Sequence, residues 1–403
     1  MKKMIACLLA LVMAVSCMGC GGDEGDPTIP TPPSSEKAPI VYKSYTVSDE
    51  EAAAARDRVV GSVYGKDLTS GLLQVYYWMG IYTFMNSGYG TYPELYGLDY
   101  TLPLDQQGPA QMEQSWQEYF LEDAISTWFV YQVLASALEA EGLSLPEEQE
   151  KALDERIAQL EESAKKEGFD TLDELIQSDA GAGCTLEDYM RYTRTYYEYK
   201  YYIQLLVERA EVTDEALQKY YQDNKQALNE EGITKDSGDV ISLRHILIVP
   251  EGGTEKDGKT VYTDAEWEAC RVKAQALLDQ WVADGATEEA FDRLAREKSD
   301  DPGSADEGGL YESLDKDTEF VEPFKNWYLE AGRQAGDYGL VKTDYGYHLM
   351  YFSGYEPEWE YHCRNGVIND TVTAQIEQLK TDHPYEVDFD KIVLGEVVLV
   401  ATS

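Results

Sequence analysis

The sequence predicts an α+β fold, in which helical segments precede and follow a stretch that begins and ends with a β-strand. Residues 241–249 (ISLRHILIV) and 343–352 (TDYGYHLMYF) are short apolar and aromatic runs, as is typical of buried strands. Between them, residues 263–284 and 288–298 have the apolar spacing of helices. Helical spacing also dominates the chain before this stretch and returns in residues 361–381. A mainly helical chain with a few short strands, and without a regular alternation of strand and helix, indicates an α+β class.

The start of the chain resembles a bacterial secretory signal. Two lysines precede an apolar run, residues 4–15, which is too short to span a membrane. A small residue followed by Cys then occurs twice, and this pattern resembles a lipobox, whose Cys carries lipid after cleavage. We expect lipidation at Cys20, with Cys17 as the alternative; plain secretion that discards both thiols is the other interpretation. Lipidation would tether the body to the extracytoplasmic face of the cell membrane.

Composition limits the classes of partner. Residues 21–39 consist largely of Gly, Pro, Ser and acidic residues, which predicts a disordered linker. The formal net charge is −43, which argues against binding to nucleic acid. A solvated acidic surface explains this charge, and a preference for basic or neutral clients is the alternative. Cys184, Cys270 and Cys363 are too widely separated for a metal site, so we expect neither a metal nor a cofactor.

Helices are predicted before the first strand from caps and apolar periodicity. Thr or Pro stands near the start of most of them, and Gly follows two of them. The predicted helices are residues 69–84, 111–141, 145–166, 171–177 and 185–210, with an irregular loop at 86–107. A stripe of Tyr189, Tyr192, Tyr196 and Tyr199 lies on one face of the last helix. Such a stripe is usually core, and a surface that holds unfolded chains is the alternative.

Residues 241–352 resemble the parvulin family of peptidyl-prolyl isomerases, because six family motifs occur in the family's order. They are His-Ile-Leu at 245–247, Phe-x-x-Leu-Ala at 291–295, Ser-x-Asp at 299–301, Gly-Gly-Leu at 308–310, Pro-Phe at 323–324 and Thr-x-x-Gly-Tyr-His at 343–348. The Gly-Gly turn is one residue shorter than the family's. The order of signal, linker, helical segments and this module resembles the PrsA-type and SurA-like extracytoplasmic foldases.

The resemblance implies a parvulin-like domain, a small antiparallel sheet with surrounding helices, inserted in a mainly α-helical chaperone domain. The expected divisions are a signal peptide (1–20), a disordered linker (21–45), the helical domain (46–235), the parvulin domain (236–357) and a C-terminal helix and strand that pack back on the helical domain (358–403). The final strand, residues 385–400, could pair with residues 59–64.

The resemblance also assigns the site. The implied catalytic residues are His245, Asp301, His348 and Thr343, and the residues implied to bind substrate are Leu310, Phe320, Phe324 and Tyr345. An Asp at position 301, where the family has Cys or Asp, argues against covalent catalysis and for an electrostatic or hydrogen-bonding role. The alternative for the two histidines is that they only satisfy each other in a strand core.

The chemistry expected of such a site is rotation about an X-Pro amide. Uncatalysed rotation takes tens to hundreds of seconds, because it must break amide resonance at a barrier of about 18–20 kcal/mol. A catalyst therefore needs an apolar slot for the proline ring, exclusion of water, and hydrogen-bonding groups that favour the twisted amide. No bond is cleaved, so no activated nucleophile is required.

The predicted function is that of an extracytoplasmic prolyl isomerase and chaperone. Its partners would be unfolded or partly folded exported proteins with X-Pro bonds, and the membrane through the lipid anchor; a homodimer stays open, and nucleic acid is excluded. One alternative is a holdase whose degenerate parvulin domain only binds unfolded chains. Another is a structural lipoprotein of the cell envelope. Changes around the Gly-Gly turn and in residues 314–319 leave the strength of the activity open.

Overall fold

The computed structural model describes residues 42–109, 113–256, 259–397 and 399. It divides into two compact units: unit 1 takes the residues up to Ala210 and from Val372 onward, and unit 2 is Glu211–Thr371. Unit 2 is one continuous stretch that interrupts unit 1, so the predicted α+β fold with an inserted domain is confirmed. The predicted signal peptide, including Cys17 and Cys20, lies outside the described residues.

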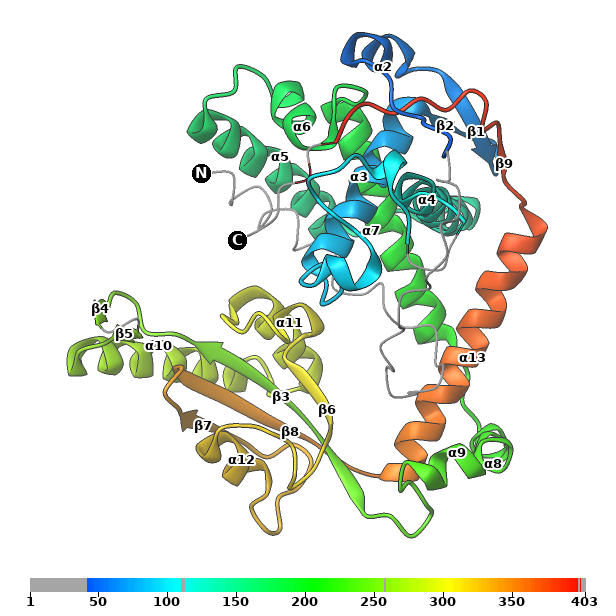
Figure 1. Cartoon of the computed structure of the whole chain (residues 1–403). Helices are drawn as coiled ribbons and strands as arrows, with labels where there is room; N and C mark the ends of the chain where they lie inside the picture. Colours follow the sequence, from blue (N-terminus) through cyan, green and yellow to red (C-terminus); the bar gives the residue numbers. More distant parts are fainter. Residues whose placement is uncertain (1–41, 110–112, 257–258, 398, 400–403) are drawn as a thin grey trace. The chain divides into compact units, whose positions relative to one another are not determined.

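Helices form most of unit 1 (Figure 1). Five of them begin directly after a Ser or Thr whose hydroxyl accepts a backbone N–H of the first turn: Ser48, Thr69, Ser115, Thr171 and Thr185. The helices are α2 (Asp49–Ala55), α3 (Ser70–Asn86), α4 (Trp116–Ala140), α5 (Glu147–Glu167), α6 (Leu172–Ala180) and α7 (Leu186–Arg209). The predicted helix from residue 111 therefore begins at Trp116, where Ser115 and Glu118 form a capping box.

The core of unit 1 is built around α3, which is buried on nearly all sides by α4 and α7. The tyrosine stripe of α7 belongs to this core, because Tyr189, Tyr192 and Tyr196 are buried and Tyr199 packs against them. Tyr76 and Tyr131 complete an aromatic cluster with these rings. The interpretation of the stripe as core is therefore correct, and its use as a holding surface is not supported.

A small antiparallel sheet lies at one edge of unit 1, with the strand order β2-β1-β9. Its strands are β1 (Val59–Val63), β2 (Lys66–Thr69) and β9 (Glu386–Val387). The C-terminal segment thus returns to the 59–64 region, as expected. The expected strand over 385–400 was too long: among the described residues of this segment, Glu386 and Val387 pair with β1, and Leu394 forms an isolated bridge to Thr46.

Unit 2 contains a four-stranded antiparallel sheet with the order β6-β3-β8-β7 (Figure 1). The strands are β3 (Asp239–Ile248), β6 (Leu310–Leu314), β7 (Tyr338–Lys342) and β8 (Tyr347–Pro357), and a separate hairpin pairs β4 (Thr254–Lys256) with β5 (Lys259–Val261). The helices are α8 (Asp214–Asp223), α9 (Lys225–Glu230), α10 (Asp264–Ala283), α11 (Glu288–Lys298) and α12 (Glu322–Tyr328). α13 (Glu358–Asp382) begins in unit 2 and ends in unit 1.

The two faces of this sheet carry different cores, because side chains alternate along each strand. On one face, Ile246, Ile248 and Leu349 pack against α10 and α11. On the other face, Leu243 and Met350 pack against Phe324 and other residues of α12. His245 and His348 share the second face, which makes it the face of interest.

Candidate functional site

The two histidines of the sheet lie side by side. His245 on β3 faces Met350 across the strand pair and His348 on β8 faces Leu247, so the two imidazoles are diagonal neighbours on the same face. Their Nδ1 atoms are 3.1 Å apart, and their rings are nearly parallel. Both side chains are buried. A pair of buried imidazoles at this distance must share one proton in a hydrogen bond.

Asp301 lies at the other edge of His245. Its Oδ2 is 3.0 Å from His245 Nε2, accepts a bond of 2.6 Å from the Ser304 hydroxyl, and accepts one of 3.2 Å from the Tyr311 hydroxyl. Ser304 Oγ is also 3.0 Å from His245 Nε2. All these contacts fall on Oδ2, so Oδ1 has no hydrogen-bond partner within the described part of the chain. One carboxylate oxygen is thus held and the other is free.

One arrangement of protons satisfies the whole chain of contacts. The Thr343 hydroxyl, 2.8 Å from His348 Nε2, donates to it, and His348 Nδ1–H donates to His245 Nδ1. His245 Nε2–H then donates to Asp301. In this arrangement both imidazoles are neutral and the carboxylate is ionised. The backbone N–H of Tyr345 donates to Thr343 Oγ1 and fixes the far end.

Burial at His348 and hydrogen bonds at Asp301 each lower the pKa of the group concerned. Burial, together with the proximity of His245, lowers the pKa of His348 to about 4, against a weaker opposing effect of Asp301. The hydrogen bond from His245 holds the pKa of Asp301 well below its usual range, with further contributions from Ser304 and Tyr311, although partial burial opposes them. His348 therefore stays neutral and Asp301 stays charged at neutral pH.

An aromatic niche lies against the imidazole pair. Phe324 meets both His245 and His348 edge-on, with ring centroids 5.2 and 5.3 Å away. Phe320 stacks on Phe324 at 4.8 Å, and Tyr311 meets Phe320 at 5.1 Å. Phe324 is buried, whereas Phe320 and Tyr311 are half-buried. Two accessible rings above a buried one give an apolar wall beside the hydrogen-bonded imidazoles.

Residues 228–353 match the family model described as PPIC-type PPIASE domain. This part of the chain is a PPIC-type parvulin domain. The resemblance to the parvulin family is thereby confirmed for these residues. No curated protein sequence matches the chain.

The chain is also similar to several solved structures, at low sequence identity and low TM-score. PrsA from Bacillus subtilis is 17% identical, with 81% of this chain and 93% of that chain covered and a TM-score of 0.32. Foldase protein PrsA from Streptococcus pneumoniae is 17% identical, with coverage of 64% and 81% and a TM-score of 0.22. A SurA-like chaperone of Campylobacter jejuni is 17% identical, with coverage of 80% and 94% and a TM-score of 0.20.

The expectation that Leu310 lines the slot of the parvulin domain is wrong. Leu310 pairs with Arg244 and Tyr311 with Leu243, and directly opposed residues share a face, so Tyr311 rather than Leu310 lies on the histidine face. Leu310 belongs to the opposite face, where Arg244 bonds Glu288 of α11. Tyr311 and Ser304 are the site residues that the sequence analysis missed. The shortened Gly-Gly turn, followed by Tyr in place of the usual Gly, was the signal that could have identified Tyr311.

The two glycines before β6 allow this turn to lie against β3. Gly308 and Gly309 both have positive φ values, 67° and 73°. A Cβ on Gly309 would lie 2.0 Å from the carbonyl oxygen of His245. The Gly309 carbonyl in turn accepts the His245 backbone N–H at 2.8 Å. Any side chain at Gly309 would therefore push β6, and Tyr311 with it, away from His245.

The other predicted site residues divide into two groups. Thr343 is buried and bonds His348, so it belongs to the network. Tyr345 bonds Thr343 through its backbone N–H, and the residue is 62% exposed. The expected substrate contact from the Tyr345 ring therefore has no support from burial or ring packing, and it stays a prediction.

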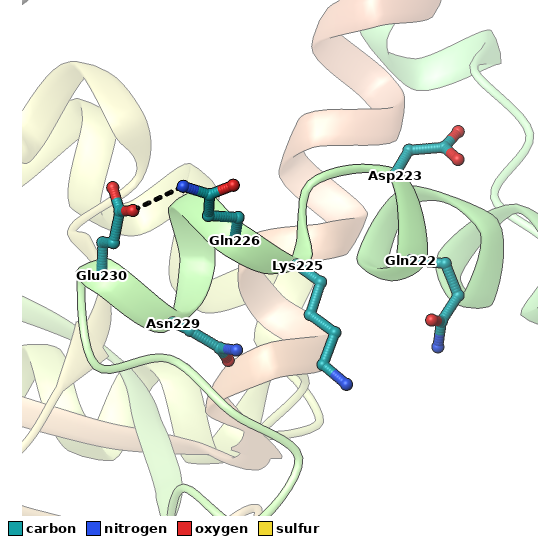
Figure 2. A pocket seen from close by; sticks show the side chains of 6 residues that line it. All are labelled: Gln222, Asp223, Lys225, Gln226, Asn229 and Glu230. Carbon is teal, nitrogen blue, oxygen red and sulfur yellow. Dashed lines mark hydrogen bonds between the residues drawn. The ribbon is translucent and has the colours of Figure 1, made fainter.

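A separate hollow lies at the turn between α8 and α9 (Figure 2). Its lining is polar, and Figure 2 shows the hydrogen bond from Gln226 to Glu230 at its edge. It shares no residue with the histidine network. Within the described residues no group of His, Cys, Asp and Glu is arranged to hold a metal ion. No helix among them has the length and apolar character that a membrane crossing requires.

The lowered pKa of His348 predicts a pH-dependent stability. Between pH 7 and pH 5 the unfolded chain takes up a proton at this histidine and the folded parvulin domain does not, so unfolding is favoured as the pH falls. With a folded pKa of about 4, wild type should lose about 2 kcal/mol more unfolding free energy over this interval than His348→Asn. Urea unfolding at both pH values measures the difference, with His362→Asn as the control. An equal loss in wild type and His348→Asn would contradict the assignment.

Proposed function

We propose that the parvulin domain catalyses cis–trans isomerisation of X-Pro bonds and that the whole chain is an extracytoplasmic foldase that assists the folding of exported proteins. One observation carries the proposal: a buried pair of imidazoles, with Nδ1 atoms 3.1 Å apart, is anchored by Asp301 and Thr343 beside an aromatic niche. The match to the PPIC-type PPIASE family supports the same activity.

In the proposed mechanism the proline ring packs against Phe320 and Phe324, which exclude water from the rotating amide. A dry environment favours the twisted amide, because its carbonyl oxygen and nitrogen carry less separated charge than those of the planar form. The hydrogen-bonded chain from Thr343 to Asp301 fixes the orientation of both imidazoles before substrate binds, so no reorganisation is needed during rotation. Oδ1 of Asp301 remains able to accept a peptide N–H of the client.

The proposal is tested with the full-length chain and a short peptide that contains one X-Pro bond, in an assay coupled to a protease that cleaves only the trans form. We expect a rate of cis-to-trans conversion that rises in proportion to the concentration of the chain. A rate equal to that in buffer at every concentration would refute the catalytic part. A parallel measurement of aggregation of an unfolded client then tests the chaperone part alone.

The runner-up function is a holdase whose parvulin domain only binds chains. One observation favours it: Tyr311 brings a polar ring to a wall for which an aliphatic residue was expected, and it bonds the carboxylate directly. The two functions differ in whether the hydrogen-bonded network of His245, His348 and Asp301 takes part in catalysis. If the chain is a holdase, Asp301→Ala leaves suppression of aggregation unchanged and no isomerisation is detected in wild type.

If the domain is an isomerase, Tyr311 is a positioning residue. Tyr311→Phe keeps the ring and removes one of the hydrogen bonds to the Asp301 carboxylate, so we expect kcat to fall about tenfold with little change in KM. The urea midpoint should stay close to that of wild type, because the ring packing remains. Tyr338→Phe, at an exposed tyrosine of the same unit, is the matched control. An unchanged kcat in Tyr311→Phe would remove Tyr311 from the mechanism.

Membrane attachment is part of the same proposal. We propose that Cys20 is lipidated and that the linker lets the folded units stand off the extracytoplasmic face of the cell membrane. Incorporation of a labelled fatty acid in a bacterial host should be lost in Cys20→Ser and kept in Cys17→Ser; the reverse result would assign Cys17. Sedimentation velocity of the chain without residues 1–20 tests the open question of a homodimer.

A further inference from the structure

An exposed aromatic loop, residues 87–107, follows α3 in unit 1. Leu95 is 70% exposed, Tyr89 60% and Tyr92 59%. These are three of the four most exposed large hydrophobic side chains in the part of the chain that the structure describes, and Tyr96 and Leu102 in the same loop are also exposed. Scattered exposed apolar residues are ordinary, but a concentration of them within one loop is typical of an interaction surface.

Hydrogen bonds and buried anchors hold the 87–107 loop. The Gln107 side chain both accepts from the backbone N–H of Asp99 and donates to its carbonyl, at 2.7 and 2.8 Å. The Trp116 indole donates to the carbonyl of Gly97. Leu98 and Leu104 are buried in the core of unit 1. The loop is therefore a structured support that presents its rings outward, which lowers the entropy cost of binding by those rings.

The exposed rings continue into the aromatic core. Tyr89 and Tyr96 meet edge-on, with centroids 5.5 Å apart, and Tyr89 stacks on Phe84 at the end of α3. Phe84 in turn contacts Trp116 at the start of α4. These contacts fix the Tyr89 ring, so its exposed side forms a preformed apolar surface and not a mobile side chain.

The charged residues of the loop and of its flanking helices are all acidic. Residues 67–150, which include the loop and both flanking helices, contain no Lys, Arg or His. The loop carries Glu94, Asp99 and Asp105, and Asp123 on α4 lies close enough to raise the pKa of Tyr119, as does Tyr89, although burial of Tyr119 is the larger cause. Aromatic faces attract cations, and carboxylates beside them strengthen that attraction.

We propose that the 87–107 loop is a docking surface for unfolded polypeptide segments in which Lys or Arg lie next to aromatic or large aliphatic residues. The inference rests on the chaperone part of the proposed function and gives that part a location and a client chemistry. Tyrosine rings supply contact area, and the carboxylates select for cationic neighbours. A second copy of this chain is a poor occupant, because its own net charge is −43.

The test uses the full-length chain and two fluorescent, proline-free peptides. One contains Lys, Phe and Leu, and the other has every Lys replaced by Glu. Because neither peptide contains proline, failure of the isomerase assignment does not affect the result. We expect fluorescence anisotropy to show binding of the lysine peptide, at least about tenfold weaker binding of the glutamate peptide, and a loss of affinity at high salt.

Variants assign the binding to the loop. The triple variant Tyr89→Ser/Tyr92→Ser/Leu95→Ser should bind the lysine peptide about tenfold or more weakly. The control Leu143→Ser/Val207→Ser makes the same kind of change at exposed positions elsewhere in unit 1 and should bind like wild type. Glu94→Lys preserves every ring, so it keeps the test valid if the triple variant does not fold. This variant should bind the lysine peptide more weakly than wild type and the glutamate peptide more tightly.

Three results would overturn the proposal. The first is wild-type affinity of both the triple variant and Glu94→Lys for the lysine peptide. The second is equal affinity of wild type for the two peptides. The third is self-association in sedimentation velocity that the triple variant abolishes, which would make a second copy the occupant. Isomerisation of a proline peptide should be the same in the triple variant and wild type, which separates this proposal from the catalytic one.

Discussion

Asp301→Ala is expected to lower kcat/KM for isomerisation of a proline peptide about a hundredfold. Asp301 is the acceptor at the end of the hydrogen-bonded chain. Its Oδ2 accepts the bond from His245 Nε2–H, with 3.0 Å between Oδ2 and Nε2. Without it, His245 can take the other tautomer, and the bond between the two Nδ1 atoms loses its direction. Ser304 and Tyr311 also lose their common partner. The protease-coupled assay measures the change.

Asp306→Ala is the matched control for this experiment. Asp306 lies in the same turn and is exposed, so the substitution removes the same charge without removing a side-chain contact of the network. We expect Asp306→Ala to be as active as wild type and Asp301→Asn to be intermediate, because Asn keeps the shape and the acceptor but not the charge. Wild-type activity of Asp301→Ala would show that the carboxylate takes no part in catalysis.

Phe324→Ala is expected to lower the free energy of unfolding of unit 2 by about 3–5 kcal/mol. The Phe324 ring is 2% exposed and contacts both imidazoles, so its removal leaves a cavity directly beneath the polar network. Water that enters this cavity would hydrate His348 and reverse the burial that lowers its pKa. Urea denaturation, with the midpoint and slope fitted together, measures the loss.

Phe320→Ala is the comparison that separates stability from binding. The Phe320 ring stacks on Phe324 but is half-buried, so its truncation should cost clearly less stability than that of Phe324. Its accessible face is proposed to contact the proline ring, so KM should still rise severalfold, by about the amount expected for loss of one apolar contact. Equal effects of the two variants on stability and on KM would contradict these roles.

Helix caps and the alternation of side chains along strands are local signals, and they explain which elements and site residues could be predicted from the sequence. A hydroxyl directly before an apolar periodic run identifies a helix start, and Thr69, Thr185 and Thr263 cap helices at the predicted positions. The alternation of strand side chains also makes it possible for His245 and His348 to share a face once β3 and β8 pair. The structure brings His245, His348, Asp301, Thr343 and Phe324 together.

Register explains what the sequence could not predict. The short Gly-Gly turn sets where β6 starts against β3, and a register shift follows only after Tyr311, between the Leu243–Tyr311 and Ile241–Leu314 pairs, where Ser313 has a φ of 56°. A shift of one residue moves every side chain to the other face, so Tyr311 takes the place expected for Leu310. The predicted length of the C-terminal strand, residues 385–400, was wrong for a similar reason. The length of a strand depends on the partner available, and β1 offers a short edge.

The central claim is that the parvulin domain speeds rotation about a proline amide. Two-dimensional NMR exchange spectroscopy of a short proline peptide tests it most directly, because it reports the cis–trans rates at equilibrium without a coupling protease. With a catalytic amount of the full-length chain, the account predicts exchange cross-peaks on the one-second timescale, against tens to hundreds of seconds without catalyst. An exchange rate that equals the rate in buffer, although the chain is folded and the peptide binds, would contradict the account.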